Sequence, residues 1–227
     1  MEDLRDFREK YRPKTLDEVW GNEHIKIIWN GYRKKGFFPH SIILSSNFGL
    51  GKTTLARIFA KDIIECEGEL SQCIEYMEFN SPECDYATIN KMLGKFRGFS
   101  CSVLMPRVLF FDEAHRMPDK AQDGFLKPIE DINFLTFIFA TSDLNRIDGG
   151  LLSRSDKYFL KPPPNDVLIS KLSRISELER IKIEKNVFEF LIERSNFCPR
   201  DCLGNLEILS NYEGVIDLQI AKEFLTQ

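Results

Sequence analysis

The residues with the clearest capacity for chemistry lie at positions 46–53, which read Ser-Asn-Phe-Gly-Leu-Gly-Lys-Thr. This stretch differs only at Ser46 from the pattern G-x-x-x-x-G-K-[ST], whose backbone N–H groups bind phosphate oxygens. An apolar run at 42–44 precedes it and a helix-like run at 54–64 follows. Because the pattern needs a strand before it and a helix after it, the sequence predicts a phosphate-binding loop here.

The side chains of this loop predict how a nucleoside triphosphate binds. Lys52 is expected to reach the β- and γ-phosphates, and the Thr53 hydroxyl to ligate Mg²⁺. The following helix adds the partial positive charge of its N-terminus. The residues expected to contact the nucleotide are Gly49, Leu50, Gly51, Lys52, Thr53 and Thr54.

Two carboxylates form the second candidate group. Asp112 and Glu113 follow an apolar run at 108–111. A buried parallel strand delivers such carboxylates to the edge of the sheet where the phosphate loop also lies. Asp112 is expected to hold Mg²⁺ directly or through water, and Glu113 to polarise the attacking water as a general base. An Asp-Glu pair after a strand is commonly only a turn or a helix cap, but pairing with the phosphate loop favours the catalytic interpretation.

Composition limits the class of protein. The 227 residues, 43% of them hydrophobic, suffice for one large or two small domains. No apolar run approaches a membrane span, and residues 1–5 do not resemble the start of a signal peptide. The net charge of −4 gives no general attraction to nucleic acid. We therefore expect a protein without membrane association, located in the cytoplasm or, in a eukaryote, the nucleus.

The six cysteines are scattered, which is typical of reduced thiols in the cytosol. Cys66, Cys73 and Cys84 are the nearest approach to a metal pattern, but their spacing matches no zinc knuckle and no histidine lies near them. The sequence therefore predicts no zinc site.

The order of the elements predicts an α/β fold. Strand signals alternate with helical runs, which indicates a parallel sheet flanked by helices. Three prolines at 162–164 then interrupt the chain, and Asn165 or Asp166 can cap a new helix. We expect a P-loop domain over residues 1–161 and a small all-helical lid over residues 162–227. The predicted strands are 42–44, 76–79, 108–112, 135–141 and 158–160, and the predicted apolar stripes of the lid are Leu168, Leu172, Ile175 and Leu178; Ile183, Val187, Phe190 and Leu191; Leu203, Leu206 and Leu209; and Leu218, Ala221 and Leu225.

Several motifs together resemble the clamp-loader ATPases, the AAA+ subunits that open sliding clamps for DNA polymerases. The opening at 9–24, Glu-Lys-Tyr-Arg-Pro through Trp-Gly-Asn-Glu-His, is similar to that of the replication factor C small subunits, the bacterial gamma/tau subunit and phage equivalents. Further similarity lies at 112–115, 151–155 and 199–203. The resemblance covers nearly the whole chain and implies an ATPase that acts with Mg²⁺.

The resemblance also implies roles for individual residues. Tyr11, Arg12 and Pro13 resemble an adenine pocket, although a capping surface loop would look the same. Ser142, with Thr141 as the fallback, lies where the family places the polar residue called sensor 1, which contacts the γ-phosphate or the attacking water. A strand-end cap is the alternative for either residue.

Two arginines match residues that act on the phosphates in the family. Arg154 resembles the arginine finger, which completes the site of a neighbouring subunit, although a surface ion pair is the alternative. Arg200 resembles sensor 2, which reports the nucleotide state to the lid, although an arginine at a helix start is the alternative. Gln122 resembles a residue that couples the ATP site to DNA, but a glutamine on a helix surface is commoner. His115 is expected to be structural.

The resemblance implies partners as well: a sliding clamp, other clamp-loader subunits in a pentameric ring, and primer–template DNA. Clamp loaders end in a helical collar domain, whereas this sequence stops at the lid, so we expect either a truncated chain or a different mode of assembly. Two alternatives remain open. One is another AAA+ ATPase of DNA metabolism, such as a helicase loader or a branch-migration motor. The other is a non-catalytic nucleotide-binding scaffold.

Overall fold

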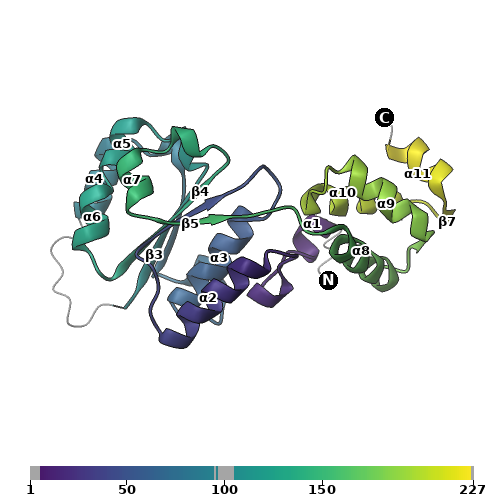
Figure 1. Cartoon of the computed structure of the whole chain (residues 1–227), viewed down its shortest axis with the longest axis horizontal. Coiled ribbons are helices and arrows are strands. Elements are labelled where there is room, and N and C mark those ends of the chain that lie inside the picture. The colour runs from purple at the N-terminus through teal and green to yellow at the C-terminus, as the bar shows by residue number, and fades with distance from the viewer. Residues whose placement is uncertain (1–5, 95, 97–104, 226–227) are drawn as a thin grey trace. The chain divides into compact units, whose positions relative to one another are not determined.

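The computed structural model describes residues 6–94, 96 and 105–225 of the chain (Figure 1). Residues 1–5, to which the expectation about a signal peptide refers, lie outside this part. The described residues form two compact units. The sheet unit contains His24–Asn47 and Lys52–Leu160, and the helical unit contains residues 6–23, Phe48–Gly51 and residues 161–225. The division into domains after residue 161 stays a prediction.

The sheet unit is built on five parallel strands in the order β2-β3-β4-β1-β5. The central strands β1, β3 and β4 are mostly apolar and buried because helices cover the sheet on both faces. All five predicted strands are confirmed, although the last begins two residues earlier than expected. The strands are β1 (Ser41–Ser45), β2 (Tyr76–Asn80), β3 (Arg107–Asp112), β4 (Leu135–Thr141) and β5 (Asp156–Phe159).

Helices cover the two faces of this sheet, with α2 and α3 on one and α4–α7 on the other (Figure 1). On the second face, Phe125 meets the rings of Phe111, Phe137 and Phe139 edge to face, with ring centroids 4.8, 5.7 and 5.2 Å away. These fully buried aromatic side chains fix the sheet against the short helices. The helices are α2 (Glu23–Lys35), α3 (Lys52–Ile63), α4 (Tyr86–Gly94), α5 (Asp119–Asp123), α6 (Leu126–Asp131) and α7 (Gly149–Ser153).

On the first face, Trp29 of α2 is completely buried and stacks on Phe59 of α3, with ring centroids 3.5 Å apart. Its indole Nε1 donates a hydrogen bond of 2.7 Å to Asp62 Oδ2, and Arg33 Nη2 lies 2.7 Å from the other oxygen of Asp62. One carboxylate therefore anchors α2 to α3 through two different donors. None of the helices in the described ranges is long and apolar enough to cross a membrane.

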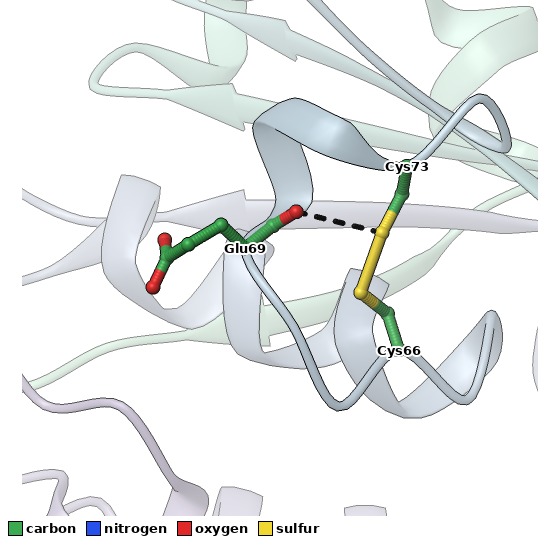
Figure 2. Close-up of a disulfide and its surroundings, with 3 residues drawn as sticks. All are labelled: Cys66, Glu69 and Cys73. Atoms are coloured by element: carbon green, nitrogen blue, oxygen red, sulfur yellow. Dashed lines mark hydrogen bonds between the residues drawn. A yellow bond between two sulfur atoms is a disulfide. The ribbon is translucent and has the colours of Figure 1, made fainter.

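The segment between α3 and β2 contains a disulfide that the sequence analysis did not predict (Figure 2). Cys66 and Cys73 are bonded to each other, and Cys73 Sγ also lies 3.6 Å from the carbonyl oxygen of Glu69. The expectation that all cysteines are reduced is therefore wrong for this pair. The two cysteines are seven residues apart, and this spacing alone does not tell a disulfide from two free thiols.

The helical unit packs its helices around a separate core. Leu168, Leu172 and Leu191 are fully buried there, and Trp20 from the N-terminal segment joins the same core at 8% exposure. The apolar stripes on α10 and α11 are confirmed. The helices are α1 (Phe7–Lys10), α8 (Asn165–Leu178), α9 (Lys185–Arg194), α10 (Pro199–Ser210) and α11 (Leu218–Leu225).

Three details of this unit differ from the sequence-based expectation. Leu178 is 64% exposed because it is the last residue of α8, where the stripe leaves the core. Ile183 belongs to strand β6 (Lys182–Ile183), which pairs in parallel with β7 (Val215–Ile216), so the unit is helical apart from these two short strands. Asn165 is already inside α8, and Pro164 at the N-cap makes no side-chain capping bond, so the expected cap is wrong.

Candidate active site

The glycines of the predicted phosphate loop adopt backbone angles that other residues avoid. Gly49 has a φ of +75° and Gly51 a φ of +94°, while Ser46 is not among the residues with positive φ. Since only the left-handed region favours glycine, the serine at position 46 fits the loop without backbone strain. This explains how the loop departs from the common pattern and keeps its shape.

Gly49 also lies against the start of α10. A Cβ added to Gly49 would overlap Cys198 Sγ and would lie 3.6 Å from Arg200 Cβ. Burial raises the pKa of the Cys198 thiol, so this contact is made by a neutral, weakly polar group. The structure thus brings Arg200, predicted as sensor 2, next to the loop residue Gly49, 151 positions away in the sequence.

Lys52 is the first residue of α3 and is 7% exposed. Its Nζ donates hydrogen bonds to the carbonyl oxygens of Ser46, at 2.9 Å, and Asn47, at 3.0 Å. The ammonium group is therefore held over the loop by backbone atoms, which any residue at position 46 could supply. Leu50 and Thr54 flank this arrangement, with Leu50 in the turn and Thr54 in the first turn of α3.

Thr53 and Asp112 come together as predicted. Thr53 Oγ1 donates a hydrogen bond of 2.8 Å to Asp112 Oδ2, although the two residues lie 59 positions apart. Asp112 ends β3 at the edge of the sheet where the loop after β1 begins. A hydroxyl beside a carboxylate is the all-oxygen donor set that Mg²⁺ prefers, so these residues fit the ion that the sequence analysis assigned to them.

Glu113 has a left-handed backbone, with a φ of +53°. Its N–H donates to Asp112 Oδ1 at 2.9 Å, and a short 3₁₀ helix, η4 (Ala114–Arg116), follows. A glutamate in this conformation costs about 1–3 kcal/mol, and such residues cluster at functional sites. The turn points the Glu113 side chain toward His115, whose Nε2 lies 3.4 Å from Glu113 Oε2.

The two candidates for sensor 1 have different surroundings. Thr141 is fully buried, and its Oγ1 donates to the Asp143 carbonyl at 2.9 Å and accepts from the Asp143 N–H at 3.1 Å. Ser142 Oγ instead lies 3.4 Å from His115 Nε2, on the side of Glu113. Ser142, not Thr141, is therefore the hydroxyl near the candidate base.

Arg154 follows α7 and keeps a partly exposed side chain. Its Nε lies 2.5 Å from Glu130 Oε1, and its Nη1 donates to the Gly150 carbonyl at 3.2 Å. The surface ion pair that was the alternative for Arg154 is therefore present, and the guanidinium remains partly exposed. The role as an arginine finger stays a prediction.

Gln122 is buried at 1% exposure, so the alternative of a glutamine on a helix surface does not hold, and its role in coupling the ATP site to DNA stays a prediction. Its Nε2 donates to the carbonyls of Met117, at 3.2 Å, and Arg146, at 3.1 Å. Its Oε1 accepts from the Asp148 N–H at 2.7 Å. One side chain therefore joins the start of α5 to the start of α7, a role that no spacing in the sequence indicated.

The predicted adenine-binding residues lie in the helical unit. Tyr11 directly follows α1, packs edge to face on Phe7 and donates a hydrogen bond from its hydroxyl to Glu179, which directly follows α8. Arg12 Nη2 lies 2.6 Å from Glu9 Oε1, and Pro13 follows in the irregular segment. The Tyr11 side chain thus fastens the N-terminal segment to the residue after α8, whereas the Arg12 ion pair lies within that segment. The contact of these residues with adenine stays a prediction.

Glu179 is the charged acceptor that receives the hydrogen bonds of Lys10 and Tyr11. Burial alone would raise the pKa of Glu179, but hydrogen bonds from Lys10 and Tyr11, together with the Lys10 charge, lower it below its ordinary value. Burial and the bond to Glu179 raise the pKa of Tyr11. The carboxylate is therefore ionised and the phenol neutral around pH 7, as the two hydrogen bonds require.

These features define a P-loop nucleoside triphosphatase: a glycine loop leads into a helix, a lysine and a threonine open that helix, and two carboxylates lie at the end of a nearby parallel strand. Residues 42–163 match the model of the ATPase family associated with various cellular activities (AAA). The chain belongs to this family.

Individual curated relatives give a more specific comparison than the family model. The DNA polymerase III subunit gamma/tau of Mycoplasma pneumoniae is 31% identical over 220 residues, which cover 90% of this chain and 32% of that protein. The replication factor C small subunit of Archaeoglobus fulgidus is 28% identical over 222 residues, which cover 96% of this chain and 67% of that protein. The resemblance that the motifs indicated is thereby confirmed. The chain spans about a third of the length of its gamma/tau relatives.

Solved structures show the same fold. The Thermotoga maritima RuvB Holliday junction branch migration motor superposes with a TM-score of 0.74 at 23% sequence identity, covering 97% of this chain and 72% of that one. At this identity the likeness concerns the fold alone.

Proposed function

We propose that this chain binds and hydrolyses ATP as a subunit of a machine that loads a sliding clamp onto primer–template DNA. The observation that carries the ATPase part is the hydrogen bond between Thr53 and Asp112, with Glu113 in a strained turn beside it. The names of the relatives support the clamp-loading part.

The chain's own residues divide the work. The loop N–H groups and Lys52 hold the phosphates, and Lys52 exchanges its carbonyl partners for phosphate oxygens. Thr53 Oγ1 and the Asp112 carboxylate would hold Mg²⁺, which neutralises phosphate charge when bound. Glu113 takes the proton of the water that attacks the γ-phosphorus in line with the leaving oxygen. Arg200 reports the phosphates to the helical unit.

Arg154 acts on the neighbouring subunit in this proposal. A guanidinium stabilises the charge that builds up on the transferred phosphoryl group, which is worth about a thousandfold or more in rate. Its partial exposure and its exposed partner Glu130 support the proposal, because docking of a neighbour can draw Arg154 away from a surface ion pair worth about 0–1 kcal/mol.

The first experiment measures ATP binding and phosphate release in parallel. We expect Lys52→Ala to abolish binding, and Glu113→Gln to bind normally and lose turnover. Lys157→Ala is the matched control for the first change, because Lys157 Nζ also donates to a backbone carbonyl, that of Leu152 at 2.8 Å. Glu78→Gln, on exposed β2, is the control for the second. Turnover by the Glu113→Gln chain equal to that of the unsubstituted chain would refute the assignment of the base.

The second experiment tests whether Arg154 acts between subunits. Arg154→Ala and Glu113→Gln chains are mixed, each inactive alone. An interface regains activity when an intact Glu113 site faces an intact Arg154, which random mixing in equal amounts produces at about a quarter of the interfaces in a head-to-tail ring. A mixture as inactive as its components would show that Arg154 does not act in trans.

Partners decide between clamp loading and its alternatives. Stimulation of turnover by a clamp together with primed DNA supports the proposal, whereas stimulation by four-way junction DNA alone would indicate a branch-migration motor. ATP binding without turnover under any of these conditions would indicate a scaffold.

A further inference from the structure

We infer that His115 is a positioning residue that holds the candidate base Glu113 and the hydroxyl of Ser142 in one hydrogen-bonded unit. This inference rests on the proposed ATP hydrolysis and adds to it a residue that the sequence analysis expected to be only structural. The observation behind this inference is that His115 Nε2 lies 3.4 Å from Glu113 Oε2 and 3.4 Å from Ser142 Oγ.

The backbone brings these three groups together from two strands. Glu113 and His115 follow β3, and the left-handed turn at Glu113 places their side chains on the same side. Ser142 follows β4, which pairs with β3 in parallel. The imidazole is almost buried, with its side chain 11% exposed, whereas the Glu113 side chain is 29% exposed and can meet a water molecule.

The protons of this unit can be assigned. His115 Nδ1 is buried and has no hydrogen-bond partner among the residues that the structure describes. A proton on Nδ1 would leave a buried N–H without an acceptor and would turn the Nε2 lone pair toward the Glu113 carboxylate. A proton on Nε2 avoids both costs, because it can be shared between Glu113 Oε2 and Ser142 Oγ. The geometry therefore favours the tautomer with hydrogen on Nε2.

This tautomer gives each neighbour a defined task. Ser142 Oγ accepts from His115 and so keeps its own hydrogen to donate toward a phosphate oxygen or the attacking water. Glu113 is held through Oε2, so Oε1 is the oxygen that takes the proton of the water. Contacts of 3.4 Å are longer than strong hydrogen bonds, as is common at catalytic groups before the substrate complex forms.

Two substitutions separate the hydrogen bond from the shape of the ring. His115→Phe keeps a flat ring in the buried site and removes the donor, while His115→Gln places an amide N–H near the position of Nε2. We expect His115→Phe to lower kcat by about 10- to 100-fold, as for loss of a hydrogen bond to a charged group, with KM for ATP within about threefold. His115→Gln should recover a large part of that loss.

His40→Phe is the matched control, because His40 also has a buried Nδ1 without a partner in the described part of the chain and lies at the opposite end of β1 from the loop. Its kcat should equal that of the unsubstituted chain. The tautomer is read independently by ¹⁵N–¹H NMR of the imidazoles of the unsubstituted chain, with the His115 signal identified by its loss in the Phe variant. We expect a proton on Nε2 of His115.

The outcomes are distinguishable. No turnover by the unsubstituted chain with clamp and DNA would overturn the proposed function and this inference with it. Normal turnover with an unchanged kcat in His115→Phe would overturn the inference alone. So would Phe and Gln variants that are equally slow, or a His115 proton found on Nδ1.

Discussion

Substitution of Gly49 by alanine gives the sharpest test of how the phosphate loop is held in place. The new Cβ meets two separate obstacles, a backbone with a φ of +75° and the Sγ atom of Cys198. Gly51 offers the comparison, because its φ of +94° is also unsuitable for alanine but a Cβ there would meet no atom of the described residues within 4 Å.

The expected magnitudes follow from this difference. A left-handed backbone costs an alanine about 1–2 kcal/mol, which both variants lose. Forcing an extra methyl group into a packed contact costs about 1–3 kcal/mol more, which only Gly49→Ala loses. The free energy of unfolding should therefore fall by about 2–5 kcal/mol in Gly49→Ala and by about 1–2 kcal/mol in Gly51→Ala.

A double-mutant cycle in urea isolates the contact with the thiol. Cys198→Ala removes Sγ and leaves Cβ, which lies 3.8 Å from the added methyl group, an ordinary van der Waals distance. We expect Cys198→Ala to restore about 1–3 kcal/mol when combined with Gly49→Ala, and nothing when combined with Gly51→Ala. Equal losses in the two glycine variants, or additive behaviour of Gly49→Ala with Cys198→Ala, would refute the packing of the loop against α10.

Three further predictions concern stability. Phe125→Ala should lower the free energy of unfolding by about 3–5 kcal/mol, measured in urea, because it removes a ring that contacts three others in the core. Gln122→Ala should cost about 2–4 kcal/mol, because it leaves three backbone groups without their partner, and a thermal midpoint close to that of the unsubstituted chain would contradict this. The pKa of Glu179 is lower in the folded chain than in the unfolded one, so the unfolded chain binds the proton more readily and stability rises with pH. The contribution of Glu179 to the free energy of unfolding should be complete above the ordinary glutamate pKa of about 4.3 and be lost as the pH falls through the lower pKa of the folded chain. Glu179→Gln should remove this pH dependence, which thermal melts at several pH values would show as a change of no more than about 1 kcal/mol.

The sheet could be predicted from the sequence because its strands are short apolar runs between turn residues. β3 and β4 are buried along nearly their whole length, so their sequences are short apolar runs and do not show the alternation of polar and apolar residues that marks a half-buried strand. The meeting of Thr53 and Asp112 could also be predicted, since parallel strands bring their carboxyl ends to one edge whatever the separation in the chain.

Other features depend on contacts that spacing does not encode. The left-handed turn at Glu113 is what aims His115 at the base, and nothing in the order Asp-Glu-Ala-His indicates it. A helix-surface position was the alternative for Gln122 because glutamine is usually exposed, but its side chain satisfies three backbone groups inside the fold. Leu178 fits the helical spacing of the apolar stripe and was therefore predicted to be buried, but it lies where α8 leaves the core.

The two tryptophans of the chain fall one into each unit, with Trp29 in the sheet unit and Trp20 in the helical core. Trp29 stacks on a phenylalanine and donates to a carboxylate, whereas Trp20 belongs to the separate core of the helical unit, so their emission should differ in colour and intensity. The protein thus has an intrinsic optical reporter for each half. Chains that retain only one indole, made by Trp20→Phe or Trp29→Phe, should reveal whether the halves melt together or in sequence.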